Sequence, residues 1–200
     1  MADATYMDKL QAQAFRAGIQ AGTPEARKWF ANKLKEVKKV NRQELLREYD
    51  KVNNLGRAAM YGRMFMYFYN PKGKKDLPYY DRFPLIFLVE KAKGGFYGLN
   101  MHYLPPNLRA IFFDRLTSYN NNKKYDETTR LRLKYQTMKS ASKLKYFKPC
   151  FKHYLNEHVA SRIVEVPSIE WSSVMFLPSE LFVKKGKSTV WKESRKIANS

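Results

Sequence analysis

The chain has 200 residues, and its 38 lysines and arginines outnumber its 18 aspartates and glutamates, which gives a formal net charge of +20. Because this charge repels itself, we expect a polyanionic or acidic partner to compensate it in the working state. The single cysteine, Cys150, excludes an internal disulfide and is typical of a reducing compartment. The longest apolar run, residues 83–89, is too short to cross a bilayer, and the N-terminal sequence lacks the apolar segment of a signal peptide. We therefore expect a soluble protein with no membrane partner.

Residues 1–58 are expected to form a helical N-terminal extension. Thr23 offers a capping hydroxyl before Pro24, which suits the first position of a helix. The apolar side chains that follow fall on one stripe of this helix: Ala26, Phe30, Leu34 and Val37. Asn41 begins a capping-box pattern and predicts a second helix over residues 42–50.

The central segment is rich in aromatic residues and predicts two or three strands. Residues 64–69 are continuously apolar or aromatic, a pattern that favours a strand buried on both faces. Residues 82–90 predict a second strand, whose Pro84 lacks an N–H and is expected at an edge or a bulge. A Gly-Gly pair then connects this strand to a third over residues 96–103, and we expect the two to form a hairpin.

The second half of the chain carries weaker patterns. Helices are expected to begin at Pro106, Asp126 and Pro149, the first ending near residue 118 and the second near residue 140, after a polar loop over residues 120–124. Residues 162–166 have the composition of a strand, whereas residues 169–177 fit a helix and a strand equally well. After Phe182 the sequence is polar and basic, which predicts a C-terminal tail over residues 183–200.

Together these elements predict an α+β fold. The strands would form a small twisted antiparallel sheet or an SH3-like barrel, closed by the strand near residues 162–166 and flanked by helices. We expect residues 59–182 to form this core domain, between the helical extension and the basic tail.

No catalytic or metal site is predicted. Cys150 and His153 would share one face of a helix, as a thiolate and its base require, but a small thiol between phenylalanines is ordinary packing. No group that would bind an oxyanion or orient the base is visible. His153 and His158 are five residues apart and would lie on different helix faces, which is no zinc spacing. We therefore expect no enzyme, no metal and no cofactor.

Basic and aromatic residues are mixed around the predicted strands, and this pattern favours nucleic-acid binding. Aromatic rings could stack on bases while lysines contact phosphates; alternatively, the rings fill the core and the lysines are its solvated rim. The predicted contacts to nucleic acid or to an acidic partner are Arg63, Lys72, Lys74, Lys75, Arg82, Lys91, Lys93, Lys184, Lys185 and Lys187. The predicted stacking or interface anchors are Tyr79, Tyr80, Phe96, Tyr97 and Trp191.

Four segments carry a resemblance to known proteins: FYNPKGKKDLPYYDRFPL (68–85), GFYGLNMHYLPPNLRA (95–110), FKPCFKHYL (147–155) and EWSSVMFLPSELF (170–182). They resemble a conserved protein family of T4-like tailed bacteriophages, common among marine and cyanobacterial myophages. LPYYDRFPL and LNMHYLPP are the most specific pieces. Members of that family are mostly of unknown or virion-associated function, so the resemblance implies a phage context and carries over no active site.

The sequence thus predicts a non-enzymatic phage structural or assembly protein. It would be a tail, neck or baseplate component whose basic surface docks on acidic subunits of the virion or on DNA. The alternative is an intracellular phage protein that binds single-stranded DNA or RNA in replication, transcription or host takeover. We expect the protein in the host cytoplasm during infection and then in the virion; the oligomeric state is left open.

Overall fold

The computed structural model describes residues 6–21, 23–52, 55, 58–118, 136, 140 and 147–199. The expected polar loop over residues 120–124 lies outside the described residues. So does the expected helix that begins at Asp126, apart from Gln136 and Ser140, which are helical. In the described part of the chain, no helix is long and apolar enough to span a membrane.

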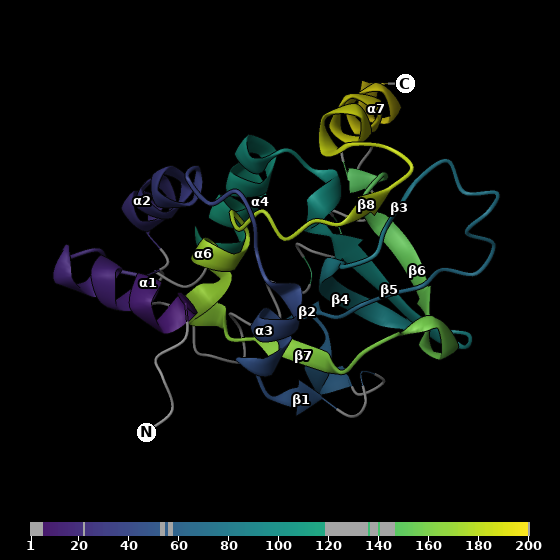
Figure 1. Ribbon diagram of the computed structural model, residues 1–200, viewed down its shortest axis with the longest axis horizontal. Coiled ribbons are helices and arrows are strands. Elements are labelled where there is room, and N and C mark those ends of the chain that lie inside the picture. Colours follow the sequence, from purple (N-terminus) through teal and green to yellow (C-terminus); the bar gives the residue numbers. More distant parts are fainter. Residues whose placement is uncertain are drawn as a thin grey trace.

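A six-stranded antiparallel sheet forms the centre of the molecule (Figure 1). Its strands, in their order across the sheet, are β1 (Lys51–Val52), β7 (Ile163–Val166), β2 (Met64–Met66), β4 (Leu85–Ala92), β5 (Gly95–Asn100) and β6 (Phe151–Leu155). β1 and β6 are the two edges, so the sheet is open and the barrel alternative is wrong. A separate two-stranded sheet pairs β3 (Tyr80–Asp81) with β8 (Phe182–Val183). The predicted α+β class with an antiparallel sheet is confirmed.

Short and long helices surround the sheet. The α-helices are α1 (Tyr6–Arg16), α2 (Pro24–Leu34), α3 (Arg42–Arg47), α4 (Pro106–Ser118), α6 (Trp171–Val174) and α7 (Lys187–Asn199), and the 3₁₀ turns are η1 (Ala58–Met60), η2 (Met101–Tyr103), η4 (Asn156–His158) and η5 (Ser168–Glu170). In Figure 1, α1, α2, α4 and α6 gather at the left, whereas α7 lies apart from them above β3 and β8. The predicted caps are confirmed: Thr23 Oγ1 accepts from the Ala26 N–H, and Asn41 Oδ1 accepts from the Glu44 N–H.

Alternating side chains of the strands build two hydrophobic clusters on the two faces of the sheet. Met64 and Met66 on β2 belong to the larger cluster, which the helices cover. Phe65 between them belongs to a smaller cluster on the opposite face, together with Tyr67 and Phe96. The fully apolar run of β2 is therefore the signature of a strand buried on both faces, as expected.

One expected helix is a strand in the structure. Residues 151–155, expected as a short helix after Pro149, form β6 and pair with β5. Their apolar spacing fits a helix, but the hairpin of β4 and β5 leaves one side of β5 open for pairing. Gly95 permits this pairing because a β-carbon there would overlap the carbonyl oxygen of Tyr154. Residues 169–177, which fitted both types, begin with the helical elements η5 and α6.

The C-terminal segment folds back onto the core as helix α7. Val190 is fully buried, and the indole N–H of Trp191 donates to the carbonyl oxygen of His102 at 2.8 Å. Trp191 was predicted as an anchor for a partner, but its polar edge faces this protein's own 3₁₀ turn η2. It therefore fixes α7 against the same turn that supports the site described below.

Changing Trp191 to Phe tests this anchor. The variant keeps most of the ring but loses the hydrogen bond to His102, so we expect the free energy of unfolding to fall by about 0.5–1.5 kcal/mol more than in a matched control. The control is Trp29→Phe, because Trp29 is also partly buried and its indole N–H has no hydrogen bond within the described residues. Urea unfolding measures both. Equal losses would mean that the hydrogen bond does not hold α7.

Candidate nucleic-acid interface

A pocket of about 260 Å³ lies at the β6 edge of the sheet, under the loop of residues 70–79. Figure 1 shows this loop at the right, beside β6. Its walls carry five tyrosines: Tyr69, Tyr79, Tyr80, Tyr103 and Tyr154. Lys72, Lys152 and His153 add basic groups, and Asp81 is the one carboxylate in the lining. We call this site the tyrosine pocket.

The buried carboxylate of Asp81 organises the inner end of the tyrosine pocket. Its Oδ1 accepts the backbone N–H groups of Phe83 (3.0 Å) and Leu181 (3.1 Å). Its Oδ2 accepts from the side-chain amide of Asn100 at 3.1 Å and lies 2.7 Å from His102 Nδ1. Burial alone would raise the pKa of Asp81, but His102 and these hydrogen bonds outweigh burial, so its pKa is lowered. Asp81 thus ties three segments of the chain together as an ionised group, around residues 81–83, 100–102 and 181.

His102 extends this network to Ser179. Its Nε2 lies 3.1 Å from Ser179 Oγ, so Asp81, His102 and Ser179 follow the order of a hydrolase triad. Exposure argues for a structural role, because His102 and Ser179 are 0% exposed and Asp81 is 4% exposed. A substrate could not reach the hydroxyl in this conformation. The network instead holds together the backbone segments that form the pocket.

A partly buried arginine, Arg42, and a buried one, Arg109, brace the same region. Arg42 donates from Nε and a terminal nitrogen to the carbonyl oxygens of Ser179 and Glu180, both at 2.7 Å. Arg109 donates to the carbonyl oxygens of Leu104 (2.7 Å) and Met175 (2.9 Å). Arg109 is 1% exposed and cannot meet a polyanion, whereas Arg42 is partly buried and uses its donors on the backbone of residues 179–180.

The segments that carry the phage resemblance meet at this network. Asp81 comes from LPYYDRFPL, Asn100 and His102 from LNMHYLPP, Ser179 from EWSSVMFLPSELF, and Tyr154 from FKPCFKHYL. Tyr154 accepts a hydrogen bond from the amide of Asn100 at 3.1 Å, which joins the fourth segment to the others. Their sequence specificity therefore has a common structural cause, a buried polar network beside a pocket.

Basic residues distant in sequence converge on the rim of the pocket. Lys184, which adopts a positive φ of 72°, donates from Nζ to the carbonyl oxygens of Lys75 and Leu77, both at 2.6 Å. Lys185 Nζ lies 5.2 Å from the centre of the Tyr79 ring and pairs with Glu193 at 2.6 Å. Because Lys72 lines the pocket on the same loop, the loop and the segment after β8 form one basic border. We call it the lysine rim: Lys72, Lys74, Lys75, Lys184 and Lys185.

The other predicted basic residues are more scattered. Arg82 is exposed and follows Asp81 in the sequence. Lys93 precedes Gly94, where a β-carbon would lie 3.7 Å from a side-chain carbon of the pocket residue Leu155. Arg63 instead pairs with Glu165 at 3.2 Å, at the other side of the sheet. Two further lysines lie outside the rim: Lys91 is exposed on β4, and Lys187 pairs with Glu180 at 3.0 Å.

Of the predicted aromatic anchors, Tyr79 and Tyr80 line the pocket and are partly buried. Phe96 is a correction: it is only 2% exposed and packs in the smaller core cluster, so it offers no face to a ligand. Tyr97 stacks on Phe151 at 5.0 Å, outside the pocket lining. The predicted set omitted Lys152, because an expected helix over these residues gave no reason to place it beside Tyr103.

Comparison with known proteins identifies the family. A family model described as the phage T4 terminal DNA protecting protein matches residues 5–197. The chain belongs to this family. No curated protein and no solved structure matches it. The resemblance to a protein of T4-like bacteriophages is thus confirmed, whereas the family description gives no support to a tail or baseplate component.

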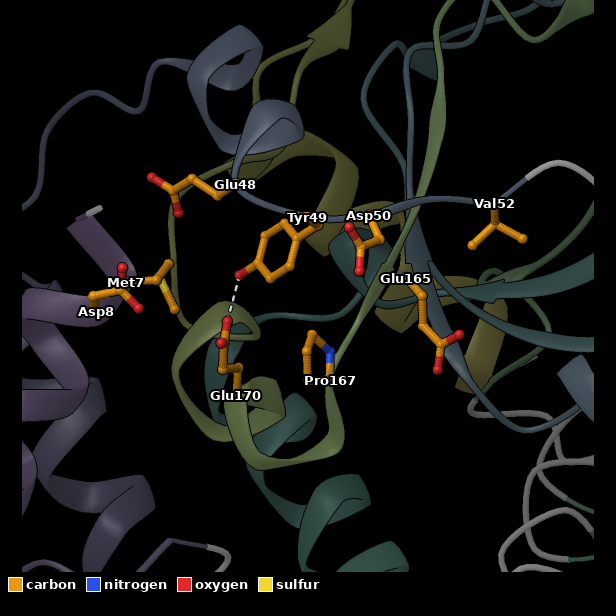
Figure 2. A pocket seen from close by; sticks show the side chains of 9 residues that line it. All are labelled: Met7, Asp8, Glu48, Tyr49, Asp50, Val52, Glu165, Pro167 and Glu170. Carbon is orange, nitrogen blue, oxygen red and sulfur yellow. Dashed lines mark hydrogen bonds between the residues drawn. The ribbon is translucent and has the colours of Figure 1, made fainter. Parts of the chain in front are cut away.

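This member of the terminal DNA protecting family also has a second pocket, of about 380 Å³, and it is acidic. Figure 2 shows its five carboxylates: Asp8, Glu48, Asp50, Glu165 and Glu170. Burial raises the pKa of Glu48 and Glu170, and Tyr49 donates a hydrogen bond to Glu170 at 2.5 Å. Among the described residues, no group of three or more acidic, histidine or cysteine side chains could hold a metal ion.

The two pockets give the protein an electrostatic polarity. The acidic pocket includes Val52 of β1 and Glu165 of β7, at one edge of the sheet, and the tyrosine pocket borders β6, at the other edge. A polyanion is repelled from the first and attracted to the lysine rim of the second. The tyrosine pocket with its rim is therefore the best candidate interface for a nucleic acid.

Proposed function

We propose that this protein binds the ends of DNA and shields them from nucleases, without catalysing a reaction itself. The observation that carries the proposal is the convergence of the lysine rim on the tyrosine pocket, at the edge of the sheet far from the acidic pocket. The printed description of the family, a terminal DNA protecting protein, supports DNA as the partner. The proposal corresponds to the nucleic-acid alternative of the sequence analysis rather than to a tail or baseplate part.

The chemistry of the site suits an end better than the interior of a duplex. Exposed lysines neutralise phosphates and release counterions, which supplies affinity but no preference for any position along DNA. Aromatic rings add stacking only where a base face is accessible. Inside a duplex both faces of each base are covered by neighbouring pairs, whereas the last pair leaves one face open. A tyrosine-lined pocket inside a basic rim therefore favours termini.

Protection also follows from simple occupancy. An exonuclease must reach the terminal nucleotide, so a protein seated there blocks it by steric exclusion and needs no catalytic group of its own. The host cytoplasm, where phage DNA meets nucleases, is the compartment that we propose for this action.

A closed DNA substrate tests the end preference. We expect the protein to bind a short linear duplex more tightly than a dumbbell of the same sequence, in which hairpin loops close both ends. At saturation it should slow digestion of the linear duplex by a double-strand exonuclease while leaving an endonuclease cut at an internal site unchanged. Both affinities are measured across a salt series, because phosphate contacts alone make binding salt-dependent. Equal affinity for the linear duplex and the dumbbell would overturn end binding.

A further inference from the structure

We propose that the tyrosine pocket holds the terminal nucleotide of one DNA strand, turned out of the duplex, with its base among the tyrosine rings and its phosphate at Lys152. This inference rests on the proposed function, because it assumes that DNA ends are the partner. It goes further in naming the chemical group that enters the pocket and the residues that receive it.

The size of the pocket fits one nucleotide. Its volume of about 260 Å³ is just below the roughly 300–1,000 Å³ of pockets that take drug-sized ligands. A base pair cannot enter a space of this size together with its backbone, whereas a single base with part of its sugar can. The nucleotide must therefore leave its partner strand, which costs least at a terminus, where pairs fray and stacking is one-sided.

The walls of the pocket suit a planar base. Tyr69, Tyr103 and Tyr154 are only 4–6% exposed and form its buried lining, whereas Tyr79 and Tyr80 are partly buried and keep surface that a base can meet. Tyr154 is held in place by Asn100, which Asp81 fixes in turn, so the walls are ordered before a ligand arrives. Tyr80 is partly buried, and its ring has no aromatic or hydrogen-bonding partner within the described residues. It is the ring most free to stack on a base.

The surroundings of Lys152 favour the binding of an anion. It is partly buried, and its Nζ lies 4.3 Å from the centre of the Tyr103 ring. Among the described residues no carboxylate lies within ion-pair distance of it, and burial lowers its pKa. By contrast, the buried Arg27 pairs with Asp114, and the buried Arg109 has Glu180 at 3.9 Å. A buried cation without a counter-charge is unfavourable, and a bound phosphate would supply that charge.

A buried hydroxyl beside the pocket is also without a partner. The hydroxyl of Tyr67 makes no hydrogen bond within the described residues. Burial raises its pKa, and Tyr154, Tyr69 and Asp81, which all line the pocket, add to the rise. Tyr67 is therefore a neutral donor next to the tyrosine walls. Because Tyr67 is 0% exposed, a base in the pocket does not reach this hydroxyl, and the proposal does not depend on it.

The first arm of the test changes only the DNA. A short duplex, closed by a hairpin at one end, carries at its open end either a normal nucleotide or an abasic one. We expect the wild-type protein to bind the abasic end about tenfold more weakly, because the stacked base is missing. 2-Aminopurine, a fluorescent base that reports stacking, should change its emission on binding when it is terminal and not when it is internal.

The second arm changes the protein. Tyr80→Leu should lose most of this tenfold preference and should bind the abasic end as the wild type does, whereas Lys152→Met should weaken binding to the normal and the abasic end alike, because both carry the phosphate. The matched controls are Tyr6→Leu on α1 and the exposed Lys28→Met on α2, which should keep the preference. Thermal unfolding of each variant identifies any that fail to fold. If a variant does not fold, the comparison of normal and abasic ends still tests the proposal, because it uses the wild-type protein only.

The outcomes separate the two proposals. Equal affinity for normal and abasic ends, with the linear duplex still preferred over the dumbbell, would overturn the nucleotide pocket and leave end binding intact. Loss of the preference for linear duplex would overturn both. Tight binding of a free deoxynucleotide monophosphate or of an RNA end, in place of the DNA terminus, would overturn the assignment to a DNA strand.

Discussion

Changing Asp81 to Asn is expected to lower the free energy of unfolding by about 3–5 kcal/mol, the cost of removing one partner of a buried charged network. An amide presents one oxygen where the carboxylate presents two. It cannot accept from Phe83, Leu181, Asn100 and His102 together, so at least one buried donor loses its partner. Urea unfolding of the variant and the wild type measures the loss. The matched control is Asp76→Asn, an exposed aspartate on the loop over the pocket, which should change stability by less than about 0.5 kcal/mol.

The dependence on pH distinguishes lost charge from lost packing. The pKa of Asp81 is lower in the folded protein than its ordinary value of 3.8. The unfolded chain therefore binds the proton more readily, and the stabilisation is present in full above the ordinary value and is lost as the pH falls through the lowered folded value. The difference between wild type and Asp81→Asn should shrink in that acidic range. A difference that stays constant there would mean that the carboxylate is not ionised in the folded protein.

The same network shows what sequence patterns can predict. The caps at Thr23 and Asn41, the hairpin of β4 and β5, and the doubly buried β2 all follow from neighbours in sequence, and all were predicted. The contact of Asp81 with His102 spans 21 residues, and that of His102 with Ser179 spans 77. No local pattern encodes these pairings. The one available signal was that these residues lie in the segments of phage resemblance.

The sequence gives the net charge of the protein, but it predicts only part of where the charged residues lie in the structure. The excess of lysine predicted a basic surface, and the exposed loop of residues 72–75 was part of the predicted interface. The tail residue Lys184 was predicted as well, but its contact with Lys75 follows from the pairing of β3 with β8. The basic chains of Arg42 and Arg109 proved to be internal braces. Composition counts such residues as surface charge, and only tertiary structure shows that Arg109 is buried and that Arg42 is partly so.

The clustering of acids is equally invisible in the sequence. The five carboxylates of the acidic pocket come from α1, the end of α3, β7 and η5, and they meet because β1 and β7 pair at one edge of the sheet. The lysine rim lies at the opposite edge of the sheet, beside β6. This separation of charge is what makes a directional contact with a polyanion physically reasonable.

Replacing Lys72, Lys74 and Lys75 together by Gln should weaken binding to linear duplex DNA by roughly two to three orders of magnitude at about 0.1 M salt. All three side chains are exposed on the loop over the tyrosine pocket, so each can neutralise a phosphate near a bound end. If each contact is lost, the slope of log affinity against log salt should fall by about 0.9 per lysine, or about 2.7 in all. The melting temperature should hardly change, because exposed charges contribute little to folding.

A second triple variant separates a local contact from the effect of overall charge. Lys28, Lys38 and Lys39 are exposed in and just after α2, and changing them to Gln alters the net charge by the same amount. If the lysine rim touches DNA, this control should keep nearly all of its affinity and its salt slope. If both variants lose affinity equally, the protein attracts DNA through its total charge, and the tyrosine pocket has no privileged position. Only a loss confined to the loop variant places the DNA phosphates at the mouth of the pocket, where a terminal nucleotide could enter it.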